Sequence, residues 1–357
     1  MWFPLFDIAF FMYGLVALLG FAGYLYKCSK SGKKARNVEF VIPSVADEKT
    51  EKSLKEVIKK IREKFQGYKI WIVVDEGKEI NIDGAETVVV PSWFEGRPCK
   101  GRALEYFVRF YAKPDKWYCF LDDDSYPMDD SFLYEIPHYE KLGYAAANGI
   151  LVPRNSRSKL CYVLDHLRLW DDLFVFRFNT GLLKRPYIGL HGELLIIKGS
   201  VLKEIGFPTD SITEDFVLAQ KLVKKGYKTW QSRTRVSIKS PNSIKDFWKQ
   251  RARWIRGIAE SMKHCSPAST AFIFFRMVGG FLSSILFAPF WLLMPPSTPI
   301  AWLGLVGTIY YVSSYFYGAL KSGDWKMLLL LPVMPIFEPA SLIYVPKTNG
   351  FVVIDKN

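Results

Sequence analysis

Cysteine and histidine are scarce in this sequence, and their spacing forms no pattern that would build a site. The five cysteines are scattered without a Cys-x-x-Cys pair, and there are only four histidines. A disulfide framework and a cysteine-based zinc site are therefore excluded, and the cysteine usage suits a reducing compartment. A phosphate-binding P-loop and an internal repeat are also missing.

Acidic residues are outnumbered: 35 Asp and Glu face 48 Lys and Arg, which gives a net charge of +13. Such an excess predicts an anionic partner such as a nucleic acid, a nucleotide or a lipid headgroup surface. Apolar residues make up 50% of the 357 residues, which excludes a wholly disordered chain. The length suits one large domain with an appendage, or two domains.

Ionisable side chains are nearly absent from residues 1–26, where Asp7 is the only one. As a helix this stretch would be roughly 39 Å long, enough for a hydrocarbon core of about 30 Å. Five basic residues follow within 27–36, and no small-residue cleavage site does. We therefore expect an uncleaved transmembrane anchor over 1–26, with the N-terminus outside and the chain that follows in the cytoplasm.

Residues 271–345 are again rich in apolar side chains, and we expect a C-terminal membrane domain there. Residues 271–294 carry one charge, Arg276, and residues 300–320 form a second uncharged run. Residues 327–345 differ, because they contain three prolines and Glu338. A carboxylate at the bilayer centre costs about 2.5–3.5 kcal/mol. This third segment is therefore predicted to be broken, re-entrant or interface-lying, with a full crossing as the alternative.

The middle of the chain, residues 37–265, is predicted to be an α/β domain. Strand-like and helix-like segments alternate along it, which indicates a mostly parallel sheet. Ligands bind such sheets beyond the carboxyl ends of the strands. The predicted strands are 38–42, 69–74, 87–90 and 117–121, and the predicted helices are 51–65 and 102–111.

Three carboxylates, Asp122, Asp123 and Asp124, follow the apolar strand 117–121. They repel one another unless a cation or solvent relieves them. Alternate residues of an extended segment face the same side, so Asp122 and Asp124 can share one hard cation while Asp123 points away. A solvated turn or a helix cap is the alternative interpretation, made less favourable by the position after a strand.

A second acidic site, Thr213-Glu214-Asp215, precedes an apolar run. By itself this pattern is typical of a helix start with acid in its first turn. The functional interpretation makes Asp215 a general base that takes a proton from an attacking hydroxyl.

A third pattern, Gln250-x-x-Arg253-Trp254, lies in a basic stretch before the second apolar region. A polybasic helix that touches anionic lipid would explain the charge. It would not explain the interleaved Gln250 and Trp254. Arginine can bind a diphosphate bidentately, and tryptophan offers a flat face for a sugar ring.

Taken in this order, the three patterns resemble the D-x-D, T-E-D and Q-x-x-R-W motifs of membrane-integrated, inverting, cellulose-synthase-like glycosyltransferases of family two. The resemblance covers roughly residues 37–320 and is greatest to archaeal and animal β-mannosyltransferases. It implies a glycosyltransferase A-type, Rossmann-like domain on the cytoplasmic side, flanked by N- and C-terminal transmembrane helices.

The resemblance also implies roles for individual residues. Asp215 and Glu214 would be catalytic. Asp122 and Asp124 would hold Mn²⁺ or Mg²⁺ near the donor diphosphate. The implied donor-binding residues are Asp75, Lys100, Asp122 and Asp123, and the implied acceptor and diphosphate gate consists of Gln250, Arg253, Trp254, Thr213 and His191.

The sequence departs from the family pattern in two places. The first box, 42–48, lacks the usual Tyr-Asn-Glu. The segment Gly189-Leu190-His191-Gly192-Glu193 stands where the family has a small-residue acceptor loop. Its His191 and Glu193 could touch the sugar or hold the loop, and we favour the second.

The implied reaction is a single displacement that moves a hexose from a nucleotide sugar to an acceptor hydroxyl. By resemblance we expect mannose from GDP-mannose, a polyprenyl- or dolichyl-phosphate-linked acceptor in glycan biosynthesis, contact with membrane lipid and no nucleic acid. The expected location is an integral cell or endoplasmic-type membrane. A UDP-glucose-dependent polysaccharide synthase, a metal-dependent phosphotransferase and a non-catalytic membrane scaffold are the alternatives.

Overall fold

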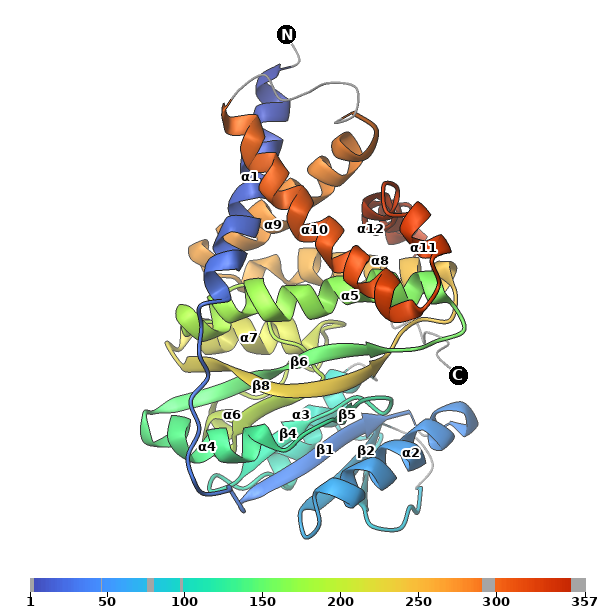
Figure 1. Cartoon of the computed structure of the whole chain (residues 1–357). Coiled ribbons are helices and arrows are strands. Elements are labelled where there is room, and N and C mark those ends of the chain that lie inside the picture. Colours follow the sequence, from blue (N-terminus) through green and yellow to red (C-terminus); the bar gives the residue numbers. More distant parts are fainter. Residues whose placement is uncertain (1–2, 46, 76–79, 97–98, 291–298, 348–357) are drawn as a thin grey trace.

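The sheet of this protein is mixed, with parallel and antiparallel pairs. A computed structural model describes residues 3–45, 47–75, 80–96, 99–290 and 299–347. In this part of the chain, eight strands form one sheet in the order β3-β2-β1-β4-β7-β6-β8-β5. Helices cover both faces of the sheet, and further helices form a layer beyond it (Figure 1).

The first half of the sheet is parallel and agrees with the prediction. It consists of β1 (Val38–Ser44), β2 (Lys69–Asp75), β3 (Glu86–Val90) and β4 (Trp117–Phe120). The central strands are nearly continuous runs of buried apolar side chains, as expected where helices cover both faces of a sheet. The α/β class and the four predicted strands are thus confirmed.

The second half departs from the prediction of a mostly parallel sheet. Strand β7 (Leu195–Lys198) runs antiparallel to β4 and to β6 (Tyr144–Arg154). The reason is the preceding segment 183–194, which enters β7 at Leu195, opposite the end of β4 at Phe120. This reversal carries the predicted loop 189–193 to the edge where the Asp triplet begins. The sheet is completed by β8 (Lys228–Lys239), parallel to β6, and β5 (Tyr126–Pro127), antiparallel to β8.

Two sets of amphipathic helices bury the faces of the sheet. One face packs against α2 (Glu48–Lys64) and α4 (Ser131–Lys141). The other packs against α3 (Lys100–Phe110), α6 (Gly199–Ile205) and α7 (Glu214–Lys224). The predicted helices 51–65 and 102–111 correspond to α2 and α3.

A third layer of helices lies beyond β6 and β8 (Figure 1). A separate apolar cluster joins its helices to one another, with Ala17, Leu164, Phe247 and Tyr310 among its buried members. The layer consists of α1 (Phe3–Gly23), α5 (Lys159–Asp171), the π-helical segment η1 (Asp172–Leu182), α8 (Ile244–Ser261), α9 (Pro267–Phe290) and α10 (Pro299–Ser322).

The predicted transmembrane spans are not supported. Helices α1, α9 and α10 form where the spans were predicted, although residues 1–2 and 291–294 lie outside the described residues. None of the described helices combines the length and the apolar character needed to cross a bilayer. Hydropathy counting does not weigh the polar contacts of these helices: Arg276 of α9 and Tyr310 of α10 both bond Asp171 of α5.

The segment 327–345, predicted to be broken, folds as a series of short helical pieces. These are α11 (Lys326–Leu329), a 3₁₀ turn at Met334–Ile336, α12 (Phe337–Ala340) and a 3₁₀ segment at Ser341–Lys347. Glu338 of α12 pairs with Arg251 of α8, which explains how a carboxylate is tolerated in this apolar stretch.

Candidate active site

A cavity of about 710 Å³ opens at the carboxyl edge of the parallel strands, between the sheet and the third layer. Its walls come from the ends of β1, β2 and β4, the starts of α3 and α7, and one side each of α8 and α9. Every candidate site residue named from the sequence lines this one cavity: Asp75, Lys100, Asp122, Asp123, Asp124, His191, Thr213, Glu214, Asp215, Gln250, Arg253 and Trp254.

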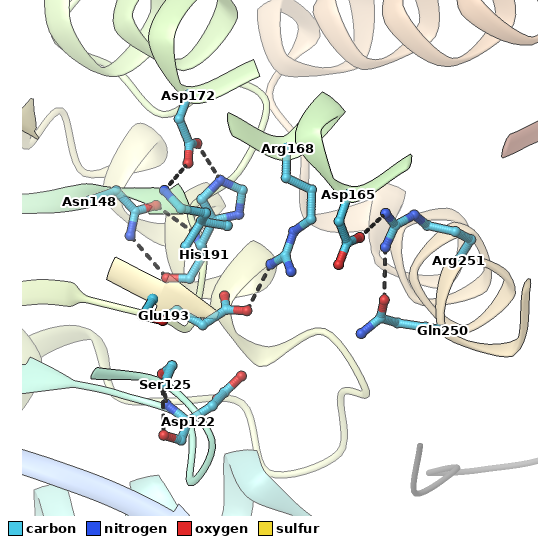
Figure 2. A network of polar contacts seen from close by, with 12 residues as sticks. Asp122, Ser125, Asn148, Asp165, Arg168, Asp172, His191, Glu193, Gln250 and Arg251 are labelled. Atoms are coloured by element: carbon cyan, nitrogen blue, oxygen red, sulfur yellow. Dashed lines mark hydrogen bonds and ion pairs between the residues drawn. The ribbon is translucent and has the colours of Figure 1, made fainter. Parts of the chain in front are cut away.

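The Asp triplet forms a fixed turn directly after β4. The hydroxyl of Ser125 accepts from the Asp122 amide at 3.0 Å and donates to the Asp122 carbonyl at 3.2 Å (Figure 2). The carboxylate of Asp123 accepts a hydrogen bond from the Ser44 hydroxyl at 2.8 Å. Asp124 is 8% exposed. The turn therefore presents three differently placed carboxylates to one cavity.

Lys100 lies between two of the carboxylates. Its Nζ is 2.5 Å from Asp122 Oδ1 and 3.1 Å from Glu214 Oε1. Gly192 of the loop lies beside it, and a Cβ there would be 2.5 Å from Lys100 Nζ, so a side chain at this position would displace the lysine. Burial would lower the pKa of Lys100, but Asp122 and Glu214 raise it well above its ordinary value. The lysine is thus a fixed positive charge.

Asp75, at the end of β2, is already engaged by the protein. One carboxylate oxygen pairs with the buried guanidinium of Arg102, and the other accepts from the Cys99 amide at 2.7 Å. Its backbone position still places it in the cavity wall.

Asp215 has a raised pKa that suits a general base. It lies in the first turn of α7, and its Oδ1 accepts from the Phe216 amide at 2.7 Å. Burial first, and then the charges of Glu214 and Glu193, raise the pKa of Asp215 to about 7 against the opposing charge of Lys100. A carboxylate with a pKa near neutrality is suited to take up a proton during a reaction.

The loop from Gly189 to Glu193 is held by charged and polar partners. Asn148 accepts from the His191 amide and donates to the His191 carbonyl, at 2.5 and 3.0 Å (Figure 2). The His191 ring nitrogen Nε2 is 2.7 Å from Asp172 Oδ1, and Arg168 donates to Glu193 at 2.7 Å. These contacts fit the interpretation in which His191 and Glu193 hold the loop.

The surroundings of the loop also shift the pKa values of its two ionisable side chains, His191 and Glu193. Burial favours neutral imidazole, but Asp172 raises the pKa of His191. Burial likewise opposes charge on Glu193, but Arg168 and His191 hold its pKa well below the ordinary value. Glu193 therefore stays ionised in a cavity where Asp215 does not lose its proton readily.

Three of the gate residues, Gln250, Arg253 and Trp254, lie on α8 and line the cavity. Gln250 is buried and Arg253 is half-buried, and burial lowers the pKa of Arg253 against the pull of nearby carboxylates, Glu214 first among them. The Trp254 ring has two guanidinium groups near its face, Arg251 at 4.5 Å and Arg168 at 5.0 Å from the ring centroid. Cation–π contacts of this kind hold the ring in one orientation.

Sequence reasoning gave no role to several charged residues that support the site. Asp165 accepts from Arg251 at 2.7 Å, and Arg251 also donates to Gln250 at 2.8 Å (Figure 2). Asp172 is fully buried beneath His191. A signal was present, because Asp165 and Asp172 are acids in an amphipathic stretch rich in apolar residues. Their partners, however, are distant in sequence.

The residues predicted to bind a metal fit a divalent cation held jointly with a substrate. The described residues contain no cluster of three or more His, Cys, Asp or Glu side chains that could hold an ion alone. Mg²⁺ is usually held by one or two carboxylates plus substrate phosphates. Burial, and then the charges of Glu193 and Asp124, raise the pKa of Asp122 despite Lys100. A cation shared by Asp122 and Asp124 would relieve this repulsion.

Residues 117–339 match the model of a family described as Glycosyl transferase family group 2. Among curated proteins, the chain is similar to the β-1,4-mannosyltransferase bre-3 of Caenorhabditis elegans, at 25% identity over 182 residues. It is also similar to the β-1,4-mannosyltransferase egh of Drosophila melanogaster, at 24% identity over 208 residues. These matches cover 48% and 54% of this chain but only 40% and 45% of the relatives' lengths.

Among solved structures, the chain resembles the mannosyltransferase PcManGT from Pyrobaculum calidifontis, determined in complex with GDP-Man and Mn²⁺. The TM-score is 0.57 at 14% identity, and the match covers 96% of this chain and 98% of the other. At this identity the likeness concerns the fold alone.

Proposed function

Because the chain belongs to glycosyl transferase family group 2, we propose that it is an inverting mannosyltransferase that uses GDP-mannose. Its mixed α/β sheet is of the glycosyltransferase A-like type. The observation that carries the proposal is the convergence of the acidic turn, the base candidate Asp215 and the gate residues in one cavity. Mannose is favoured because the relatives bear the name β-1,4-mannosyltransferase.

In the proposed reaction, Asp215 takes the proton of an acceptor hydroxyl. The hydroxyl oxygen then bonds to the anomeric carbon of the sugar while the bond to the nucleoside diphosphate breaks on the opposite side. Arg253 and Lys100 offset the negative charge that moves onto the leaving diphosphate. A divalent ion held by Asp122 and Asp124 would supply further charge stabilisation there.

The acceptor is proposed to be linked to a lipid, as a polyprenyl- or dolichyl-phosphate derivative. The cavity wall formed by α8 and α9 includes an apolar part made of Ile255, Ile258, Ile273 and Met277. Free sugars bind to hydrogen-bonding groups, whereas a hydrocarbon chain gains from burial against such a wall.

We further propose that the enzyme works at a membrane surface. Large apolar side chains are exposed on the neighbouring helices α1 and α10, for example Leu18, Ile309 and Phe316. Patches of this kind mark interaction sites for lipid or protein. The cytoplasmic location of the catalytic domain stays a prediction.

A nucleotide-binding assay tests the donor first. Binding of GDP and UDP to the full chain is compared by calorimetry, each with and without Mn²⁺. We expect GDP to bind more tightly than UDP and to need the metal. Tighter UDP binding would favour the UDP-glucose alternative, and no binding of either nucleotide would contradict glycosyl transfer.

Product length tests the acceptor. GDP-mannose with a radiolabelled sugar is incubated with the enzyme and a lipid extract, and the products are separated by size. We expect label in short lipid-linked glycans, and chelation of divalent ions should abolish it. Long polymer would instead support the polysaccharide synthase alternative. The phosphotransferase alternative has no support, since the family match is to glycosyl transferases.

A further inference from the structure

One face of α9 brings a single cation into the apolar part of the cavity. Ile273, Arg276, Met277 and Gly280 all line the cavity, at a spacing that places them on one side of the helix. On α8, Ile255 and Ile258 line the same cavity. Arg276 is therefore the charged residue on this face of α9, while Arg251 and Arg253 of α8 and Asp171 of α5 line the cavity as well.

The guanidinium of Arg276 is fixed but not saturated. It pairs through Nη2 with one oxygen of Asp171, whose other oxygen accepts from the Tyr310 hydroxyl at 2.9 Å. Arginine has five N–H donors, and no other hydrogen bond from Arg276 is found among the described residues. Its side chain is 28% exposed, so the remaining donors are accessible from the cavity.

The part of the cavity around Arg276, called the Arg276 end below, has charged neighbours that differ from those of Asp215. Burial disfavours charge on Arg276, but Asp171, Tyr311 and Tyr310 raise its pKa, so the charge is kept. The pKa of Asp215 responds instead to Glu214, Lys100 and Glu193. Five lysine and arginine side chains line the cavity: Lys100, Arg168, Arg251, Arg253 and Arg276. Of these, Arg276 is the one on α9, on the same face as Ile273 and Met277.

We propose that the Arg276 end binds the phosphate of an amphiphilic acceptor, with the hydrocarbon chain along α8 and α9. Arginine recognises phosphate through paired N–H donors, and burial of each CH₂ group of the chain adds about 0.8 kcal/mol. A phosphate joined to a hydrocarbon chain satisfies both features of this end at once. The inference rests on the proposed function and assigns the Arg276 end to the phosphate and hydrocarbon chain of the acceptor.

Binding of dodecyl phosphate to the full chain in neutral detergent, measured by calorimetry, tests the inference. Dodecanol and inorganic phosphate serve as probes that carry only one of the two features. We expect dodecyl phosphate to bind more tightly than either. Equal binding of inorganic phosphate would mean a site for free phosphate, and equal binding of dodecanol would mean a merely apolar site; each result overturns the inference.

The variant Arg276→Met tests whether Arg276 is the residue that binds the phosphate. It should weaken dodecyl phosphate binding by about tenfold or more, the usual effect of losing a charge-assisted hydrogen bond. The matched control is Arg109→Met, which removes an arginine paired with Glu105 outside the cavity and should bind like the wild type. Unchanged binding by Arg276→Met would contradict the assignment.

GDP binding in the same samples separates this inference from the proposed function. Arg276→Met should bind GDP as the wild type does, because Arg276 belongs to the other end of the cavity. Normal GDP binding without any preference for dodecyl phosphate overturns the inference and leaves the function standing. If Arg276→Met does not fold, Arg276→Lys replaces it. Lysine keeps the charge beside Asp171 but lacks the paired donors, so unchanged dodecyl phosphate binding would again contradict the assignment.

Discussion

At the scale of single residues, the cavity is defined by carboxylates that differ in protonation. Glu193 is held in its ionised form by Arg168, whereas Asp215 is disfavoured in that form by burial and by Glu214. Two carboxylates in one cavity can therefore perform different tasks. In many enzymes, different surroundings give two neighbouring acids different pKa values, so that one can act as an acid and the other as a base.

Asp215→Asn should abolish transfer while leaving donor binding intact. The amide has nearly the same shape but cannot take up the proton, and general-base help is typically worth about 10²–10⁴ in rate. Radiolabelled transfer and GDP calorimetry on the same preparation measure the two effects. Turnover within about tenfold of the wild type would remove Asp215 as the base.

The pH dependence of transfer should report the Asp215 carboxyl. A base must be deprotonated to act, so kcat/KM should fall as the pH drops below about 7 and level off above it. Glu214→Gln removes a negative neighbour, which makes ionisation of Asp215 easier and should move the inflection to lower pH. An inflection that stays in place in this variant would show that another group is titrating.

At the scale of elements, the gate helix α8 is held in place by charges from two other helices. Arg251 of α8 bonds Asp165 of α5 at 2.7 Å and Glu338 of α12 at 3.1 Å. The same guanidinium donates to Gln250 and stacks on Trp254. The positions of two gate residues therefore depend on contacts with segments 86 and 87 residues away in the sequence.

Glu338→Gln should lower stability and displace the gate. One of the two anions of Arg251 is lost, for which we expect about 1–3 kcal/mol less free energy of unfolding. Transfer should fall more than GDP binding does, because the donor end of the cavity is unaffected.

The matched control is Glu260→Gln, which removes an exposed partner of Arg256 in α8. Chemical denaturation should show a change below about 1 kcal/mol for this control. A similar loss of stability in both variants would argue against a special role for the ion pair between Glu338 and Arg251.

At the scale of the whole molecule, close helix contacts join the third layer into one body. Gly14 of α1 lies so near α10 that a Cβ would be 2.1 Å from the carbonyl oxygen of Leu303. Gly23 of the same helix lies equally near the carbonyl oxygen of Phe174 in η1. Helix α1 is thus packed on both α10 and the segment that leads into the catalytic loop.

Gly14→Leu should loosen α1 from α10. The backbone of α10 has to move to admit the side chain, and overpacking of this kind typically costs about 1–3 kcal/mol. Thermal unfolding should therefore occur at a lower temperature. Gly32→Ala is the matched control, since a Cβ at Gly32 meets no atom within 4 Å. If both variants unfold at the wild-type temperature, the close contact between α1 and α10 is not a determinant of stability.

The sequence by itself determined the α/β class, the first four strands and a set of candidate residues that the fold places in the wall of one cavity. These follow from local patterns: apolar runs predict buried strands, and acids placed directly after a strand end at the edge of the sheet. Asp122 could be located in this way because its position depends only on β4.

Only the tertiary structure decided the reversal of β7, the pairing of Asp172 with His191 and the contacts of Arg251 with Asp165 and Glu338. Each depends on groups that are far apart in the chain, and such pairs leave no periodic trace in a single sequence. The contacts of α9 and α10 with α5 are of the same kind: Arg276 and Tyr310 lie against Asp171, which hydropathy does not reveal.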